Sequence, residues 1–494
     1  EVGEGRNVTH QQKKLNEEEL RAFRSRFGIP ISDDEVAKAP FYKPADDSPE
    51  MKYLRERREA LGGYVPTRPL TAPQLKTPAV DDYRGFIEKS AGREVSTTTG
   101  AVTLMASLLK DKSVGKYIVP IVPDESRTFG MDPLFKQCGI YAHTGQLYEP
   151  VDSDQLLYYR EAKDGQILEE GITEAGSMSS FVAAGTAYSS HGVPMIPIFI
   201  YYSMFGFQRI GDLIWAACDM RARGFMLGGT AGRTTLNGEG LQHQDGHSHL
   251  FATAYPTVRA YDPAFVYEVV TIMLDGMDRM YAKGEDWVYY ITVYNENYEM
   301  PPMPPGCEQG ILKGIYRLRE VAAEKPAADL PQVQLLGSGA ILREVLRAAE
   351  MLAKSWGISS TVWSVTSWKE LRREAQECRR WNMLHPEAEP RQSYLETTLA
   401  AADGVFVAAS DHVRAVPEQL DPWIPGGLFA LGTDGFGRSE TRGVLRRHFE
   451  VDAECIVIGT LYQLAQRGAI GGDQVAQAIA TLGIDPDKID AAMA

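Results

Sequence analysis

A segment rich in glycine and histidine is the first candidate for chemistry in this sequence. Residues 228–249 contain six glycines and three of the nine histidines, His243, His247 and His249. Such a long segment without apolar periodicity inside a domain is usually functional or disordered. Its glycines also let the backbone approach a ligand closely.

The three histidines allow more than one interpretation. Their spacing, H-x3-H-x-H, could bind a metal ion with Glu239 or Asp245 as a fourth ligand, but it matches no standard zinc pattern. A role in proton transfer or ligand contact for at least one histidine is therefore favoured over a metal site. Histidines of a solvated loop are the non-functional alternative, so the histidines alone leave the function open.

Two glutamates stand at the ends of expected buried elements. Glu174 comes just before a helix of small residues expected at 175–190, where a lone glutamate most often only interacts with the helix dipole. Glu125 follows an apolar strand expected at 117–122. Ligands of parallel sheets lie at the carboxyl ends of the strands, so the position of Glu125 favours a function.

Aromatic residues end the next expected strand, at 195–202. Tyr202 and Phe205 lie where a flat ring could be held, although they could also belong to the core. A Gly-Ser-Gly turn at 337–339 lies between a strand and a helix, as phosphate-binding turns do. Because the third glycine and the acidic residue of a dinucleotide-binding fingerprint are missing, a structural turn is favoured there.

The elements that must position these residues alternate between strands and helices. Short apolar runs of β-forming residues predict strands at 117–122, 195–202, 224–227, 257–261 and 287–293. Asp262 and Pro263 then predict a helix start, with a helix that continues to about residue 281. The alternation indicates an α/β domain with a mostly parallel sheet.

A proline-rich boundary separates a second domain of the same class. Four prolines lie at 301–305, before Gly306. Beyond it we expect helices at 340–356 and after Asp452, and strands at 333–336, 361–365, 404–408 and 428–431. Residues 1–75 contain a charged helix candidate at 16–27 and few periodic apolar residues, so a connector is expected there.

Composition and charge restrict the class of protein. The 494 residues carry a net charge of −15, which disfavours a nucleic-acid binder and a polybasic membrane-surface protein. The best apolar run, at 195–205, is about half of the roughly 20 residues that a membrane span needs. Five cysteines, an odd number without metal-binding spacing, favour a reducing cytoplasm. The chain begins with Glu1 instead of Met, so a fragment or a processed piece is expected.

Four segments of the sequence resemble one enzyme family, the decarboxylating first component of the bacterial pyruvate dehydrogenase complex, homodimeric type. They are residues 122–130 (VPDESRTFG), 201–212 (YYSMFGFQRIGD), 234–249 (TTLNGEGLQHQDGHSH) and 431–439 (LGTDGFGRS). The segments are long and specific, and the similarity spans essentially the whole chain. The resemblance implies an α/β, transketolase-like thiamine diphosphate-binding fold.

The same resemblance implies two consecutive α/β domains with mostly parallel sheets. Residues 1–75 are expected to form the tail of a diphosphate-binding domain and a connector, 76–305 the pyrimidine-binding domain, and 306–494 the C-terminal domain. The Gly-Asp-Gly motif that binds Mg²⁺ and diphosphate in this family is absent. We therefore expect no metal ligand in this chain, with Mg²⁺ bound by a missing first domain.

The resemblance also implies residues that contact the cofactor. Glu174 matches the glutamate that hydrogen-bonds the aminopyrimidine ring of thiamine diphosphate. Phe205 matches the aromatic ring that stacks on this pyrimidine. Tyr202 and Glu125 match polar neighbours of the pyrimidine and of the substrate.

Two histidines are implied in the reaction in the same way. His243 matches an active-centre histidine in the segment 234–249. His10 matches a histidine on a mobile loop that closes over the site and helps the acetyl group pass to a lipoyl arm. The surroundings of His10 in the sequence would not have suggested a function by themselves.

The function implied is thiamine diphosphate-dependent oxidative decarboxylation of pyruvate, with reductive acetylation of the lipoyl group of the dihydrolipoyl acetyltransferase component. A cytoplasmic homodimer is expected, without a nucleic-acid or membrane partner, and this chain alone is expected to be incomplete. Two alternatives stay open. One is another transketolase-like enzyme with a different donor, such as a ketol, and the other is a non-catalytic scaffold fragment.

Overall fold

The chain forms two compact units, Glu1–Pro69 and Leu70–Ala494. The structure is a computed structural model, and it describes residues 5, 7, 14–63, 73–123, 126–151, 153, 159–326 and 330–494. Two of the predicted site residues, His10 and Glu125, lie outside the described residues.

Three helices make up the described part of the first unit: α1 (Glu17–Phe27), α2 (Asp33–Val36) and α3 (Pro49–Ala60). The helix predicted at 16–27 is confirmed as α1. The Asn16 side chain accepts a hydrogen bond from the backbone N–H of Glu19 at 2.8 Å, and the Glu19 carboxylate accepts one from the Asn16 N–H at 3.0 Å. Within 14–63, Val36 is the one buried residue, so these helices enclose almost no core of their own.

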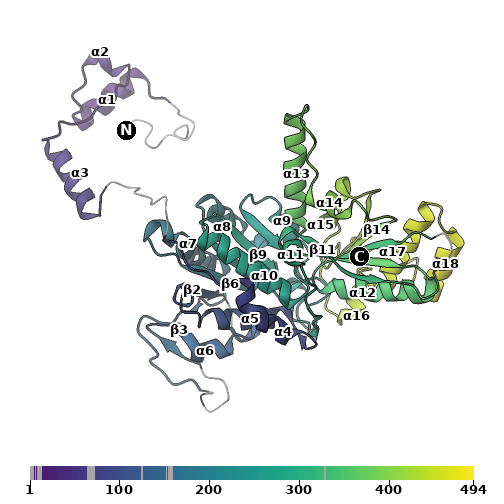
Figure 1. Cartoon of the computed structure of the whole chain (residues 1–494). Coiled ribbons are helices and arrows are strands. Elements are labelled where there is room, and N and C mark those ends of the chain that lie inside the picture. The colour runs from purple at the N-terminus through teal and green to yellow at the C-terminus, as the bar shows by residue number, and fades with distance from the viewer. Residues whose placement is uncertain are drawn as a thin grey trace. The chain divides into compact units, whose positions relative to one another are not determined.

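A six-stranded parallel sheet organises the first part of the second unit (Figure 1). Its order is β5-β2-β6-β7-β9-β8. The strands are β2 (Ile118–Val122), β5 (Leu168–Glu169), β6 (Ile196–Tyr202), β7 (Gly224–Gly229), β8 (Val258–Tyr261) and β9 (Val288–Thr292). Five of them confirm strands predicted from apolar runs, whereas the two-residue β5 was too short to leave such a run.

Seven helices of this part accompany the sheet: α4 (Arg84–Ser90), α5 (Thr97–Leu108), α6 (Asp132–Cys138), α7 (Glu174–Ser190), α8 (Phe207–Asp219), α9 (Ser248–Ala252) and α10 (Val266–Met277). The small-residue helix predicted at 175–190 is confirmed as α7, which packs on β6 and β2. Two short pairs complete this part. They are β1 (Glu94–Val95) with β10 (Tyr298–Glu299), and β3 (Ile140–Tyr141) with β4 (Glu161–Ala162).

The helix start predicted at Asp262 is wrong. Helix α10 begins at Val266. The Glu268 carboxylate accepts hydrogen bonds from the N–H groups of Ala264 and Phe265, the two residues just before the helix. The Asp262 carboxylate is instead fully buried among side chains that lie far from it in the sequence. A buried aspartate and a capping aspartate share the same local pattern, so the sequence could not separate them.

A five-stranded mixed sheet organises the rest of the second unit, in the order β11-β13-β12-β14-β15. The strands are β11 (Ile315–Val321), β12 (Val333–Gly337), β13 (Ser360–Val365), β14 (Phe406–Ala409) and β15 (Leu428–Leu431). The four parallel strands confirm the predictions. Strand β11 pairs antiparallel with β13 at the edge of the sheet and was missed, because three of its seven residues are charged and exposed.

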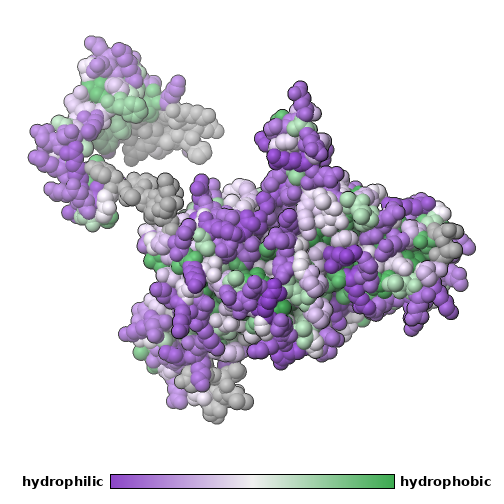
Figure 2. Space-filling model, in the orientation of Figure 1, coloured by the Kyte–Doolittle hydropathy of each residue, from purple (hydrophilic) through white to green (hydrophobic). Residues whose placement is uncertain are grey.

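Eight helices belong to this part: α11 (Glu308–Lys313), α12 (Leu342–Met351), α13 (Trp368–Leu384), α14 (Tyr394–Leu399), α15 (Ala415–Glu418), α16 (Arg442–His448), α17 (Ala453–Gln466) and α18 (Gly472–Thr481). Helix α13 extends from the body of the unit at the top of Figure 1, and Figure 2 shows mostly hydrophilic side chains over it. None of the described helices combines the length and apolar character that a membrane crossing requires.

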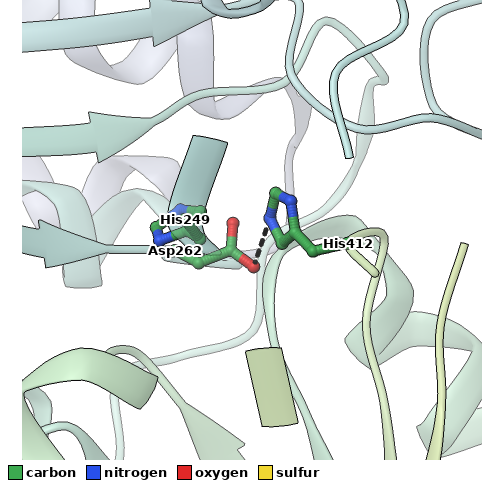
Figure 3. A group of neighbouring side chains, drawn as sticks. All are labelled: His249, Asp262 and His412. Atoms are coloured by element: carbon green, nitrogen blue, oxygen red, sulfur yellow. Dashed lines mark ion pairs between the residues drawn. The ribbon is translucent and has the colours of Figure 1, made fainter. Parts of the chain in front are cut away.

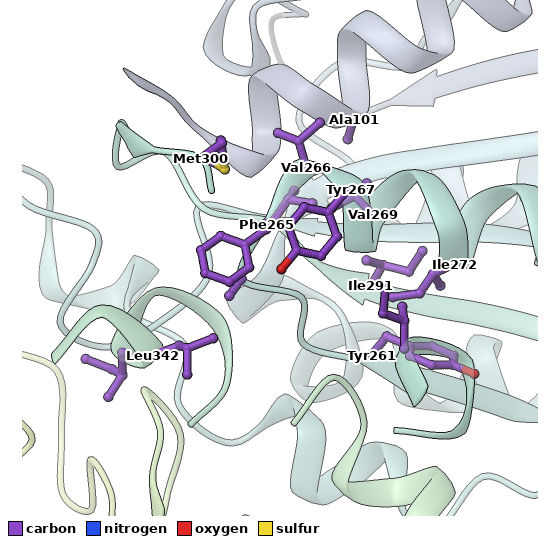
Figure 4. Packing of buried hydrophobic residues seen from close by; sticks show 14 of the residues in the cluster. Ala101, Tyr261, Phe265, Val266, Tyr267, Val269, Ile272, Ile291, Met300 and Leu342 are labelled. Carbon is purple, nitrogen blue, oxygen red and sulfur yellow. The ribbon is translucent and has the colours of Figure 1, made fainter. Parts of the chain in front are cut away.

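One hydrophobic cluster includes buried residues of both sheets and of the helices on them. Figure 4 shows Val266 of α10 beside Ala101 of α5, with Leu342 of α12 in the same region. A Cβ atom on Gly100 would lie only 2.7 Å from a methyl group of Val266, so this glycine permits the close packing of α5 and α10. The two sheets of the second unit are therefore held together by a shared core.

Candidate active site

The parallel order of the first sheet brings the predicted residues to one edge. Strand β6 ends at Tyr202 and continues into the short turn η5 (Ser203–Phe205). Its neighbour β7 ends at Gly229 and leads into the glycine-rich segment that carries His243. Because carboxyl ends of parallel strands share one edge, residues far apart in the sequence meet there.

Three predicted residues form an aromatic cluster at this edge. The ring centroids of Tyr202 and Phe205 lie 6.1 Å apart. The imidazole of His243 lies 4.9 Å from the Tyr202 ring and 5.4 Å from the Phe205 ring. The Phe205 ring meets the other two rings edge to face, at 70° and 65°, and the Tyr202 and His243 rings are tilted by 41°, so the three rings pack against one another.

Glu174 joins this cluster through an arginine that the sequence analysis missed. Glu174 is the first residue of α7 and is 5% exposed. Its carboxylate accepts a hydrogen bond from Nη1 of Arg209 at 2.9 Å. The same guanidinium lies over the Phe205 ring, with its central carbon 3.9 Å from the centroid. A flat cation thus fills the space between the buried carboxylate and the aromatic ring.

His243 has few polar contacts for a residue in such a position. Its Nδ1 atom lies 3.5 Å from a carboxylate oxygen of Glu239. This nitrogen is buried and makes no hydrogen bond with the residues that the structure describes. The imidazole can therefore exchange a proton or a hydrogen bond with a group that enters beside Tyr202 and Phe205.

The other two histidines of the segment, His247 and His249, make hydrogen bonds with residues outside the aromatic cluster. Nε2 of His247 lies 2.6 Å from Oε1 of Gln208, and burial lowers the pKa of His247. His249 is buried, with Nε2 at 3.0 Å from the Thr292 hydroxyl, and burial lowers its pKa to about 3. The three histidines do not converge on one point, so the interpretation of H-x3-H-x-H as a metal site is not supported.

Behind the site, His249 belongs to a buried polar network with Asp262 and His412 (Figure 3). Nε2 of His412 lies 3.2 Å from a carboxylate oxygen of Asp262, and both side chains are fully buried. Burial lowers the pKa of His412, but the charge and hydrogen bond of Asp262, together with the charges of Asp245 and Asp411, outweigh burial and raise it. Burial would likewise raise the pKa of Asp262, but the His412 charge and hydrogen bonds lower it. The centre of the network is thus a buried ion pair. Its aspartate follows a strand of the first sheet, and its histidine follows a strand of the second.

This network is the one group among the described residues whose ligand atoms, within 4.8 Å of one another, could hold a metal ion. The Asp262 carboxylate, however, already accepts hydrogen bonds from the hydroxyls of Thr292, Tyr294 and Ser338. With the His412 contact, both of its oxygens are occupied. The donor set therefore favours a closed ionic network over a metal centre.

The sequence contained a signal for Arg209 that was not used. It lies inside the segment 201–212 and follows the predicted stacking residue Phe205 by four positions. No local signal existed for Asp262 and His412, whose contact joins residues 150 positions apart in the chain.

Comparisons with known proteins agree with the geometry. Residues 75–301 match the family model described as pyruvate dehydrogenase E1 component middle domain, and residues 314–452 match the transketolase-like TK C-terminal domain. The pyruvate dehydrogenase E1 component of Pseudomonas aeruginosa is 54% identical over 487 residues, which are 98% of this chain and 55% of that protein. That of Escherichia coli is 50% identical over 497 residues, which cover 100% of this chain and 55% of that protein.

The chain thus spans about half the length of the curated relatives it matches. Among solved structures, transketolase from Campylobacter jejuni gives a TM-score of 0.57 at 15% identity, over 90% of this chain and 59% of that one. Transketolase from Leishmania mexicana gives 0.54 at 15% identity, over 92% and 52%. These likenesses show the transketolase-like α/β fold, and the family match together with identities of 50–54% shows what nearly the whole chain is similar to: about half of a pyruvate dehydrogenase E1 component.

Proposed function

We propose that this chain supplies the pyrimidine-binding side of an enzyme that decarboxylates pyruvate with thiamine diphosphate and acetylates a lipoyl group. The acetyl acceptor would be the lipoyl-bearing dihydrolipoyl acetyltransferase component. The names of the relatives support the reaction. The observation that carries the proposal for this chain is the arrangement of Glu174, Arg209 and Phe205.

The Arg209 guanidinium acts as a stand-in for the cofactor's pyrimidine ring. It is planar and cationic, it donates a hydrogen bond to Glu174, and it lies on the face of Phe205. An aminopyrimidine ring with an N–H group can make the same two contacts. The residues therefore fit the ring chemically, and we assign Glu174 as the hydrogen-bond acceptor and Phe205 as the stacking residue.

When bound, thiamine diphosphate supplies the electron sink that decarboxylation of a 2-oxo acid requires. The Glu174 carboxylate would stabilise a positive charge on the pyrimidine ring and fix the orientation of the ring. The aromatic cluster would exclude water from one side of the ring. Tyr202 and Glu125 are assigned as polar neighbours of the ring and of the substrate. We propose that His243 exchanges a proton beside the substrate carbonyl. His10 is proposed to serve the later transfer to the lipoyl disulfide.

We also propose the domain assignment of the chain. Residues 1–75 would belong to a diphosphate-binding domain and its connector, 76–305 to the pyrimidine-binding domain, and 306–494 to the C-terminal domain. The sequence has no Gly-Asp-Gly motif, so Mg²⁺ and the diphosphate would be bound by the part of the relatives' length that this chain does not span. The location we propose is the cytoplasm.

The test of the proposed function uses a full-length enzyme, as long as the relatives, whose sequence contains these 494 residues. Pyruvate-dependent reduction of an artificial electron acceptor measures decarboxylation, and acetylation of a lipoyl domain measures the second step. Both should require thiamine diphosphate and Mg²⁺. Turnover of a ketol instead of pyruvate would indicate another transketolase-like enzyme, and absence of cofactor binding would indicate a scaffold.

Removing the stand-in should open the pyrimidine site. We expect Arg209→Ala to raise the affinity of this chain for a pyrimidine probe, 4-amino-5-hydroxymethyl-2-methylpyrimidine, by about 3–10-fold. The guanidinium gives up one half-exposed ion pair and one cation–π contact when the ring binds, each of about 0.5–1 kcal/mol at such sites. Titration followed by NMR measures the affinity.

A matched variant controls for the loss of surface charge. Arg317 is exposed and pairs with Glu320 on β11, away from the aromatic cluster. We expect Arg317→Ala to leave the affinity for the probe unchanged. Equal affinity of the Arg209→Ala variant and the unchanged chain would show that the guanidinium does not occupy the pyrimidine position.

We further propose that the protein is a homodimer. Large apolar side chains are exposed on α8, α9 and the turn η6 (Leu241–His243): Trp215 is 50% exposed, Leu241 51% and Phe251 42%. Helix α8 and η6 pack on η5, and α9 packs on α8. Extensive apolar surfaces of this kind are typical of permanent interfaces. The proposed site would then lie near a subunit boundary.

Sedimentation velocity at micromolar concentration checks the homodimer. We expect a species of twice the mass of the chain, and dissociation in the Trp215→Glu variant because a charge enters the interface. Met383 on α13 is 71% exposed and provides the control, since Met383→Glu should leave the dimer intact. A monomeric unchanged chain would contradict the proposal.

A further inference from the structure

The segment that carries His243 lies against the carboxyl ends of two strands of the other sheet. Asp411 follows β14, and residues 432–439 follow β15. In parallel sheets this edge normally receives a ligand. Here both loops make hydrogen bonds with the segment 230–247 instead. The second sheet therefore uses its usual ligand-binding edge to hold a loop of the first.

Asp411 fixes the beginning of this segment. It is fully buried, and its two carboxylate oxygens accept hydrogen bonds from the Thr234 N–H at 2.8 Å and from the Thr235 hydroxyl at 2.6 Å. Gly232 has a φ of +88°, and a Cβ atom there would lie 2.2 Å from Asp411. The carboxylate thus lies directly on the backbone, where only glycine leaves room for it.

Gln244 fixes the end of the segment, next to His243. Its side chain is buried, and Oε1 accepts a hydrogen bond from the Arg438 N–H at 2.7 Å. Its Nε2 donates to the Leu236 carbonyl at 3.1 Å, which ties the end of the segment to its beginning. A Cβ atom on Gly437 would lie 2.5 Å from the Leu241 carbonyl, so the two backbones are in contact there.

Further hydrogen bonds fill the interval between these two ends. The Ser439 hydroxyl donates to the Glu239 carbonyl at 3.0 Å, and Nε of Arg442 donates to the Thr235 carbonyl at 2.6 Å. Both of these acceptors are backbone carbonyls of the segment. The contacts therefore set where the backbone lies rather than what its side chains bind.

We propose that residues 437–439, through Gln244, position the imidazole of His243 against Tyr202 and Phe205. This inference rests on the reaction role proposed for His243. Nδ1 of that imidazole makes no hydrogen bond with a described residue, and a carboxylate oxygen of Glu239, on the same segment, lies 3.5 Å from it. Its place is set by its backbone turn, and that turn is held by Gln244 and Gly437. Displacing a reacting group by about 1 Å can cost about 100-fold in rate.

The substitution Gly437→Ala tests the inference with a single added methyl group. The backbone of Gly437 does not have a positive φ, so alanine is strained only by close contacts. Its Cβ would lie 2.5 Å from the Leu241 carbonyl oxygen and 3.0 Å from Oε1 of Gln244. The same substitution at Gly443, which has open space around it, is the matched control. Gln244→Met is a second variant, which removes both side-chain hydrogen bonds without adding bulk at the contact.

Two measurements separate positioning from folding and from the proposed reaction. The first uses the chain labelled with ¹³C at histidine, with His243→Gln to assign its resonance among the nine histidines. We expect Gly437→Ala and Gln244→Met to shift this resonance, and Gly443→Ala to leave it unchanged. The second measures turnover in the full-length enzyme, where both variants should lose about 10–100-fold with little change in cofactor affinity.

The outcomes distinguish the inference from the function on which it rests. An unshifted His243 resonance in both variants, with the fold intact, overturns the positioning inference. A shifted resonance with full turnover supports the contact but overturns the reaction role proposed for His243. A shifted resonance with reduced turnover and a changed pH profile supports both.

Discussion

Glu174→Gln is expected to slow hydrogen–deuterium exchange at the reactive carbon of bound thiamine diphosphate by about 100–1,000-fold in the full-length enzyme. The amide has nearly the shape of the carboxylate, but it is neutral and cannot stabilise the same protonation of the pyrimidine ring. The carboxylate is 5% exposed, so water cannot replace it easily. Exchange is followed by rapid acid quench and NMR, and turnover should fall in parallel.

A neighbouring glutamate provides the control for this variant. Glu170 lies four residues earlier, is half-buried, and accepts a hydrogen bond from the Ser180 hydroxyl at 2.6 Å. We expect Glu170→Gln to leave exchange unchanged, and both variants to melt within a few degrees of the parent. Normal exchange in Glu174→Gln would show that another group activates the cofactor.

Much of this site could be predicted because it follows from strand order. Strands β6 and β7 are continuous apolar runs that the sequence identifies, and parallel pairing then brings Phe205 and His243 to the same edge. The start of α7 at Glu174 was equally clear, since the small residues after it form a regular helix. Their meeting within a few ångströms is therefore a consequence of topology rather than of local chemistry.

The contacts between the two sheets could not be predicted in the same way. Asp262 looked like a helix cap, Asp411 had no distinctive neighbours in the sequence, and Gln244 lay in the candidate segment without a role of its own. Each gains its role from a residue more than 100 positions away: His412 for Asp262, Thr234 for Asp411, and Arg438 for Gln244. Long-range side-chain contacts leave no periodic pattern, so the segment 431–439 was noticed only through its resemblance to a family.

The ion pair between Asp262 and His412 leads to the largest expected effect on stability. Asp262→Asn should lower the free energy of unfolding by about 3–5 kcal/mol at pH 6, because it leaves a charged histidine buried without its counter-charge. The surface pair of Asp278 with Lys283 is the control, and Asp278→Asn should cost less than about 1 kcal/mol. Urea denaturation followed by circular dichroism measures both.

The pH dependence of the same measurement checks which charges are involved. The folded pKa of His412 is raised, so its contribution is fully present below its ordinary pKa of about 6.5 and is lost as the pH rises through the raised value. The folded pKa of Asp262 is lowered, so its contribution is present above about pH 3.9 and is lost as the pH falls through the lowered value. Burial lowers the pKa of His249 to about 3, so this residue opposes folding increasingly below about pH 6.5. The charge of His412 also lowers the pKa of His249, so the variants are compared only at pH 6 and above. The difference between the parent and His412→Gln should therefore be largest near pH 6 and shrink towards pH 9. A difference that does not change between pH 6 and pH 9 would show that His412 is neutral in the folded protein, and that hydrogen bonds alone join Asp262 to the second sheet.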